Sequence, residues 1–195
     1  MIASILKLSP GDIKTLKIKD AYSIHRVVYT LFPGDSRTFL YLDAGGNFQY
    51  RKILILSRNA PKIPECGELE SKSVPEDFLN NSKYAFSVRL NPVFRKTGSK
   101  KMIPVRGETE LKKWFLSRQD VWGFRTQTDH LAVSETGLQD FRKGEHTVVH
   151  NQATFMGTLE VTDRSVFNHS FEMGIGRAKA FGFGLLQLRP LTEIK

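Results

Sequence analysis

The chain has 195 residues, which is room for one compact domain or two small ones. With 40% hydrophobic and 25% charged residues, its composition excludes collagen-like, coiled-coil and disordered chains. Lysine and arginine outnumber aspartate and glutamate by 29 to 20, so the net charge is +9 and the sequence pI about 9.7. This balance favours a polyanionic partner, either nucleic acid or an acidic membrane face.

Several classes of protein and site are also excluded. The one cysteine, Cys66, cannot form an internal disulfide or a cysteine-based zinc site, and it is typical of a reducing cytoplasm. The longest apolar runs have the length of a strand, far below the roughly 20 residues of a membrane helix. Lys7 and Pro10 interrupt the N-terminal apolar stretch too soon for a signal peptide. Because no cationic amphipathic helix is present, we expect a cytoplasmic protein that binds nucleic acid and no membrane.

The first 80 residues predict the order β-α-β-β, followed by a weak strand and a short helix. Asp20 is a suitable N-cap for the first helix, and Gly45-Gly46-Asn47 is a hairpin signal between the second and third strands. The expected strands are 1–8, 38–43, 51–57 and 70–74, and the expected helices are 20–32 and 75–81.

The remaining residues predict the order β-α-β-β-α-β, which is the ferredoxin-like split motif. The expected strands are 84–90, 121–128, 155–162 and 183–188, and the expected helices are 108–118 and 163–173, the last capped by Gly174. We therefore expect an α+β protein of two tandem ferredoxin-like (RRM-like) βαββαβ domains, 1–80 and 81–195, with antiparallel sheets. Helices would cover one face of each sheet and leave the other faces and the cleft between them for a ligand.

Most of the excess positive charge lies after residue 80, and one segment, 91–107, contains no acidic residue. Prolines and glycine in this segment predict a loop. Its cations are Arg95, Lys96, Lys100, Lys101 and Arg106. The segment is either solvated surface or part of an RNA-binding face.

The helix predicted at 20–32 has two different faces. Its core face carries aliphatic residues, namely Ala21, Ile24, Val27, Val28 and Leu31. Tyr22, His25, Arg26 and Tyr29 fall on the other face, where residues three and four apart are neighbours. His25 is therefore either a solvated helix residue or a reactive imidazole beside a phenol and a guanidinium.

The reactive interpretation fits RNA cleavage by the substrate's own 2′-hydroxyl. That reaction needs one group to take the 2′ proton, another to protonate the departing 5′ oxygen, and cations to hold the phosphate. Histidine suits the proton transfers because its pKa of about 6.5 lies near working pH. No metal and no cofactor are required, since the nucleophile belongs to the substrate.

The other histidines carry no such pattern. His146 and His150 are four residues apart, but they lie in a β-branched stretch and lack the glutamate of a helical zinc motif, so we expect no metal site. Arg142 and Lys143, just before them, predict an exposed hairpin tip that is either a phosphate contact or a polar turn.

A glycine-rich segment follows the last helix. Its sequence from residue 174, GIGRAKAFGFGLL, matches neither the dinucleotide-binding fingerprint nor a Walker A loop. Backbone donors, with Arg177 and Lys179, can cup phosphates, although a helix cap and a tight turn also explain some of these glycines. The glycines concerned are Gly174, Gly176, Gly182 and Gly184.

This segment resembles the C-terminal signature of the CRISPR repeat-processing endoribonucleases, a RAMP-superfamily group, in their CasE-like branch. Three other stretches agree in order and spacing: AYSIHR at 21–26, FSVRLNP at 86–92 and GTLEVTD at 157–163. The resemblance covers nearly the whole chain, although several loops are shorter than in the family.

The resemblance implies a protein that binds the hairpin repeat of a CRISPR precursor RNA and cuts 3′ of the stem without metal. It implies the catalytic role for His25, the neighbouring tyrosine's role for Tyr22, and a grip on the RNA stem for Arg142 and Lys143. The implied partners are the precursor RNA, the mature guide RNA and other subunits of a surveillance complex. Two alternatives remain: a catalytically inactive RNA-binding subunit, and a metal-independent ribonuclease unrelated to CRISPR.

Overall fold

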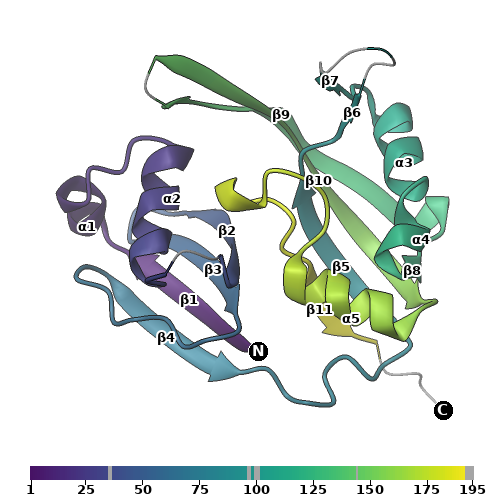
Figure 1. The fold of residues 1–195 in the computed structure, drawn as a ribbon, viewed down its shortest axis with the longest axis horizontal. Coiled ribbons are helices and arrows are strands. Elements are labelled where there is room, and N and C mark those ends of the chain that lie inside the picture. Colours follow the sequence, from purple (N-terminus) through teal and green to yellow (C-terminus); the bar gives the residue numbers. More distant parts are fainter. Residues whose placement is uncertain (35–36, 96–97, 99–101, 144, 192–195) are drawn as a thin grey trace.

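The computed structural model describes residues 1–191 except 35–36, 96–97, 99–101 and 144. Two large β-sheets lie side by side, each with its own helices, and the glycine-rich segment runs between them (Figure 1). Every strand pair in the described residues is antiparallel, as predicted. None of the helices described is long and apolar enough to cross a membrane.

The first half forms a four-stranded sheet in the order β2-β3-β1-β4. Its elements are β1 (Ile2–Leu8), α1 (Pro10–Thr15), α2 (Ala21–Thr30), β2 (Phe39–Gly46), β3 (Arg51–Ser57) and β4 (Glu68–Ser73). The aliphatic face of α2 packs on this sheet, where Ile24 and Val28 meet Leu6, Ile53 and Ile55. This packing leaves the opposite face of α2 available for the site.

The second half forms a sheet in the order β11-β5-β10-β8, and β9 also pairs with β10. The elements are β5 (Lys83–Leu90), β6 (Val93–Arg95), β7 (Met102–Pro104), α3 (Glu108–Leu116), α4 (Gln119–Trp122), β8 (Phe124–Arg125), η1 (Thr128–His130), β9 (Leu131–Lys143), β10 (His146–Val161), α5 (Arg164–Met173), η2 (Lys179–Phe181) and β11 (Gln187–Pro190). Aromatic residues dominate the core of this half, with Phe115 stacked on Phe155 at 4.7 Å between ring centroids.

The ribbon formed by β9 and β10 is much longer than the strand predicted at 155–162. Lys143 pairs with His146, so the hairpin tip lies at the predicted place, and the ribbon extends toward α2 (Figure 1). In this way a strand from the second half reaches the helix that carries His25.

A third apolar cluster joins the halves. Leu40, Leu42 and Leu56 of the first sheet pack against Phe171 and Leu185 of the second half. The prediction that the uncovered sheet faces stay free for a ligand is therefore wrong for this face of the first sheet.

One predicted element after residue 74 is wrong in type, and another is much shorter than predicted. The segment 75–81 forms turns rather than a helix: the Phe78 amide donates to the Pro75 carbonyl at 3.1 Å and the Asn80 amide to the Asp77 carbonyl at 2.9 Å. The strand predicted at 121–128 is found only as the two-residue β8, which pairs with β10, and its first two residues belong to α4 instead. Gly123, with φ of 78°, ends α4 after Trp122 enters the core.

Other elements differ in extent or were not predicted. The final strand begins at Gln187 rather than at residue 183, because Gly184 instead bonds to the backbones of Ile175 and Arg89. The segment 91–107 contains the short ribbon β6–β7, not only a loop. Helix α1 was not predicted, although Ser9 and Asp12 form a capping box there.

Candidate active site

Helix α2 positions the central side chain of the site, His25. Asp20 caps the helix as predicted: its carboxylate accepts from the Ser23 backbone at 2.8 Å, and the Ser23 hydroxyl accepts from the Asp20 backbone at 3.0 Å. Burial of the Asp20 carboxylate opposes ionisation, but the hydrogen bonds from Ser23 outweigh it and lower the pKa below its usual value. The first turn of α2 is therefore fixed, and His25 lies one turn further on.

The His25 ring is held by a backbone carbonyl from the other half of the chain. Its Nδ1 lies 2.7 Å from the carbonyl oxygen of Ala180, in the glycine-rich segment. Because a carbonyl can only accept, Nδ1 carries the hydrogen, and Nε2 of the neutral ring is the nitrogen with a free lone pair. His25 and the glycine-rich segment, 155 residues apart in the sequence, are thus in direct contact.

Aromatic rings surround the half-buried His25. Its ring centroid lies 4.1 Å from that of Tyr29, 5.1 Å from Phe181 and 5.6 Å from Tyr22. Phe141 of β9 adds a further ring, 5.9 Å from Tyr22 and 4.6 Å from Phe181. Residues from α2, β9 and η2 therefore meet at one place, with Tyr22 beside His25 as predicted.

Arg142 follows Phe141 at the end of β9 and is exposed. Its neighbour Lys143 makes the last pair of the ribbon. Since successive side chains of a strand point to opposite faces, Arg142 lies on the face of the ribbon opposite the Phe141 ring.

The glycine-rich segment brings Ala180 and Phe181 to His25. At Gly184, with φ of 83°, a Cβ atom would lie 2.3 Å from the Ile175 carbonyl oxygen, so only glycine fits this approach. Lys179 is half-buried, and its ammonium donates to the carbonyls of Met173 and Gly174 at 3.0 and 2.8 Å. Burial, and more weakly Arg37, lowers the pKa of Lys179. Two of the three N–H donors of Lys179 are therefore used by backbone carbonyls at the C-terminal end of α5. Arg177, in contrast, is exposed.

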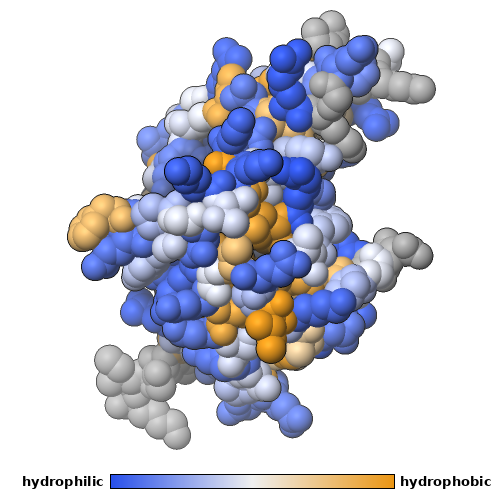
Figure 2. All heavy atoms as spheres, turned by 90° about the vertical axis from the view of Figure 1, so that its left-hand side faces the viewer, coloured by the Kyte–Doolittle hydropathy of each residue, from blue (hydrophilic) through white to orange (hydrophobic). Residues whose placement is uncertain are grey.

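Other predicted RNA-binding residues lie apart from His25. Arg26 is exposed and lines a groove of about 410 Å³ with Val27 and Ile63, a groove that His25 does not line. Figure 2 views the molecule from the side of α1 and α2, where hydrophilic side chains surround a central apolar patch. Arg95 is exposed on β6, and Lys96, Lys100 and Lys101 lie outside the described residues.

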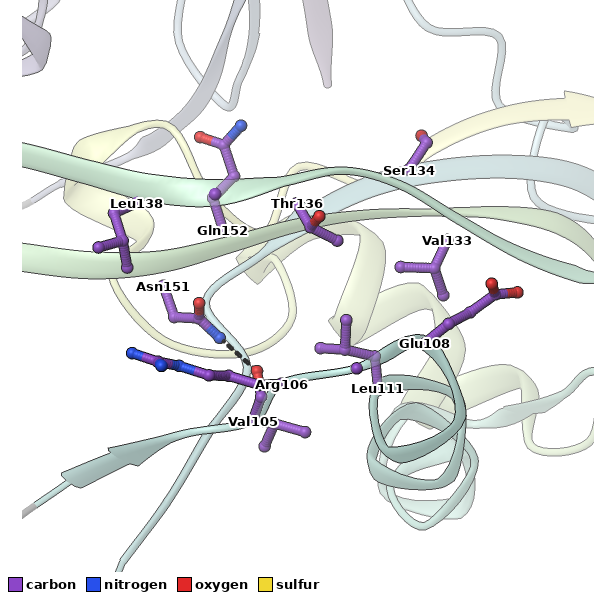
Figure 3. Close-up of a pocket in the computed structure, with 12 residues that line it drawn as sticks. Val105, Arg106, Glu108, Leu111, Val133, Ser134, Thr136, Leu138, Asn151 and Gln152 are labelled. Carbon is purple, nitrogen blue, oxygen red and sulfur yellow. Dashed lines mark hydrogen bonds between the residues drawn. The ribbon is translucent and has the colours of Figure 1, made fainter.

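A second hollow lies on the other side of the β9–β10 ribbon. This cavity of about 440 Å³ is bounded by the start of α3 and by the ribbon, with Arg106 at its edge (Figure 3). Leu138 lines it, whereas the next residue, Gln139, donates to the Phe181 carbonyl at 3.4 Å. Since successive side chains of a strand point to opposite faces, the ribbon separates this cavity from His25.

Sequence reasoning missed several residues around His25. Tyr41, Gln139, Phe141, His150 and Phe181 all contact the glycine-rich turn or belong to it. Phe181 lies inside the glycine-rich segment, so the sequence could have marked it as a site residue. The others come from distant strands, and no local pattern marks them.

The chain matches the profile of the family described as CRISPR associated protein over residues 3–190. The chain belongs to this family. The resemblance seen in the glycine-rich segment is thereby confirmed. No curated protein matches the sequence of this CRISPR-associated chain.

Solved structures share its fold. The CRISPR endoribonuclease Cse3 bound to a 19-nucleotide RNA superposes with a TM-score of 0.83 at 20% identity, over 97% of this chain and 100% of that one. Cas6e from Escherichia coli K-12 gives a TM-score of 0.76 at 22% identity, over 98% and 100%. A chain of a CRISPR RNA-guided surveillance complex gives 0.76 at 16% identity, over 98% and 100%. The CRISPR-associated chain therefore has a Cse3/Cas6e-like α+β fold.

Proposed function

We propose that this chain is a metal-independent endoribonuclease that binds the hairpin repeat of CRISPR precursor RNA and cleaves 3′ of the stem to give the mature guide RNA. The observation that carries the proposal is the hydrogen bond from His25 Nδ1 to the Ala180 carbonyl, which leaves Nε2 free beside Tyr22. Family membership and the fold shared with an RNA-bound endoribonuclease support it.

The reaction needs few protein groups. The 2′ oxygen forms a bond to phosphorus while the bond from phosphorus to the 5′ oxygen breaks, which leaves a 2′,3′-cyclic phosphate and a 5′-hydroxyl. His25 Nε2 takes the 2′ proton, protonates the departing 5′ oxygen, or does both in turn; where it makes only one of these transfers, solvent water takes up or supplies the other proton. Tyr22 orients the phosphate or the imidazole. The nucleophile belongs to the RNA, so the mechanism requires neither metal nor cofactor.

The basic side chains supply the binding surface. Arg142 and Lys143 at the hairpin tip contact the stem, whose A-form shape and phosphates are recognised rather than its paired bases. Arg26, Arg95, Arg177 and Lys179 add further phosphate contacts, and Lys96, Lys100 and Lys101 extend this set. The processed RNA is retained, or passed with the protein to a surveillance complex in the cytoplasm.

We also infer that the halves are tandem ferredoxin-like domains, 1–80 and 81–195. In both sheets the first and third principal strands are central and the second and fourth lie outside. Each half also has its own hydrophobic cluster. The first half departs from the motif between β3 and β4, where the described residues contain no helix.

The function is tested by His25→Ala on synthetic repeat hairpins. We expect the single-turnover cleavage rate to fall at least 100-fold, because a positioned acid or base contributes about 10²–10⁴ in rate, while RNA affinity is retained. EDTA should leave the wild-type rate unchanged, and a 2′-deoxy substitution at the scissile nucleotide should prevent cleavage.

His169→Ala is the matched control, since this histidine is exposed on α5 and outside the ring cluster. It should cleave at the wild-type rate. Undiminished cleavage by His25→Ala would reject the assignment. A wild-type protein that binds the hairpin but never cuts it would instead be the inactive RNA-binding subunit, and equal cleavage of unstructured RNA would indicate a general ribonuclease.

A further inference from the structure

The turn that holds His25 depends on partners outside itself. Element η2 spans only Lys179–Phe181, with one bond across it, from the Phe181 amide to the Ala178 carbonyl at 2.8 Å. Ala178 and Gly182 on either side are both left-handed, with φ of 60° and 84°. Such an isolated turn has no neighbouring helical bonds to fix its carbonyls, so their direction is set by side chains from elsewhere.

Tyr41 of β2 is one of these side chains. Its hydroxyl donates to the Ala180 carbonyl oxygen at 3.1 Å, the same oxygen that His25 Nδ1 contacts at 2.7 Å. Tyr41 is 1% exposed, and a Cβ atom at Gly182 would lie 3.3 Å from its ring, so the turn rests directly on this residue. Burial raises the pKa of Tyr41, which keeps the hydroxyl protonated and therefore a donor.

We propose that Tyr41 is a positioning residue for His25: it holds the Ala180 carbonyl so that His25 keeps its hydrogen on Nδ1 and presents Nε2 to the RNA. The proposal rests on the proposed function of His25. Free imidazole side chains favour the opposite tautomer, so the carbonyl must be well placed to reverse that preference. Gln139 of β9, in the same half as the turn, donates to the next carbonyl, that of Phe181.

Tyr41→Phe removes only the donor oxygen and leaves the ring. We expect the single-turnover cleavage rate to fall about five- to tenfold, the equivalent of one hydrogen bond, with the RNA Kd unchanged. Tyr84→Phe is the matched control, because Tyr84 is 0% exposed and its hydroxyl donates to the Phe78 loop carbonyl at 2.8 Å, away from the ring cluster around His25. Because the Tyr84 hydroxyl also accepts from the Asn81 amide at 3.1 Å, this variant should lose at least as much stability as Tyr41→Phe and yet keep the wild-type rate.

The tautomer of His25 supplies a readout that a general loss of stability would not change. Long-range ¹H–¹⁵N spectra of histidine-labelled protein should show His25 protonated on Nδ1 in the wild type and Tyr84→Phe. In Tyr41→Phe the share of the Nε2-protonated form should rise. The proposal requires both the slower rate and the changed spectrum, so either one alone overturns it.

These outcomes are distinguishable from a failure of the proposed function. If the wild-type protein does not cleave repeat RNA, the nuclease assignment fails at that step. The spectra of Tyr41→Phe and Tyr84→Phe would still show whether Tyr41 sets the His25 tautomer.

Discussion

The His150 imidazole is enclosed by three phenyl rings next to the candidate site. Ring centroids of Phe181, Phe183 and Phe141 lie 5.2, 5.6 and 5.7 Å from it. Its Nδ1 is buried and has no hydrogen-bond partner among the described residues. Burial lowers the pKa of His150, because a charged imidazole loses hydration there. His150 therefore supports Phe181, and through it His25, as a neutral ring.

This burial predicts a loss of stability in acid. His150 has its ordinary pKa of about 6.5 when unfolded and a lower one when folded, so below pH 6.5 the unfolded state binds the proton first. The free energy of unfolding is fully maintained above pH 6.5 and falls below it, by at most about 1.4 kcal/mol per pH unit. Urea unfolding measured at pH 8 and at pH 5.5 gives the decrease in the free energy of unfolding between the two pH values. This decrease should be smaller in His150→Phe than in the wild type.

The control for this experiment lies on the same strand. His146 is exposed, so His146→Phe should lose as much stability in acid as the wild type does. If the free energy of unfolding decreased equally from pH 8 to pH 5.5 in His150→Phe and in the wild type, His150 would not be held neutral.

At the scale of elements, the glycine-rich segment is fixed by backbone contact. The Ile175 amide donates to the Gly184 carbonyl at 3.0 Å, and the Gly184 amide donates to the Arg89 carbonyl at 2.8 Å. Gly184→Ala adds a Cβ 2.3 Å from a backbone oxygen at positive φ, and backbone cannot move aside as a flexible side chain can. We expect a loss of about 2 kcal/mol or more in the free energy of unfolding, measured by urea titration.

Gly184→Ala should also slow cleavage, since the segment carries the Ala180 carbonyl. Gly137→Ala on β9 is the comparison, because a Cβ atom there meets nothing within 4 Å. If both variants unfolded at the same urea concentration, the close backbone approach would not be what requires glycine at 184.

Elements with complete local signals could be predicted from the sequence. Helix α2 has its capping residue and an aliphatic stripe, α5 has Asp163 before it and Gly174 after it, and β5 alternates cleanly. By contrast, α4 is one helical turn with the sequence QDVW, and the run VWGF that begins inside it is as typical of a strand. Whether this segment is helix or strand depends on the burial of Trp122 in the core of the second half. That core is built from residues far apart in the sequence, so a local pattern does not reveal it.

The candidate site divides in the same way. His25 and Tyr22 could be identified because helical periodicity separates their face from the core face. Tyr41 lies 139 residues from Ala180, and their contact depends on how the two sheets meet. Gln139 lies 42 residues from Phe181, and their contact depends on how far the β9–β10 ribbon extends. The prediction of an α+β fold with antiparallel sheets did not depend on these contacts, since it needed only the type and order of the elements.

At the scale of the whole molecule, the candidate site exists only where the halves meet. His25 and Tyr41 come from the first sheet and its helix, while Ala180, Phe181 and Phe141 come from the second half. The apolar cluster around Leu40 and Phe171 holds the two sheets together close to this point. A change in the relative position of the halves would therefore move His25 away from its carbonyl without altering either sheet.

The net charge of +9 belongs to the whole molecule, and it predicts how RNA binding responds to salt. Each phosphate neutralised by a cation releases counterions, so the logarithm of the association constant should fall linearly with the logarithm of salt concentration. Arg142→Ala removes one exposed cation from the hairpin tip and should reduce that slope by just under one. Filter binding of an uncleavable 2′-deoxy repeat hairpin between 50 and 300 mM salt, roughly the range over which such contacts weaken, would measure it.

Arg125→Ala provides the comparison for that slope. Arg125 is also exposed, but it lies on β8, far from the hairpin tip in Figure 1, and its guanidinium is 3.3 Å from Asp120. Its loss changes the net charge by the same amount as the loss of Arg142, so a slope that depends only on total charge would shift equally in both variants. A smaller slope in Arg142→Ala alone places a phosphate at the end of the β9–β10 ribbon, whereas equal slopes would remove the hairpin tip from the RNA-binding surface.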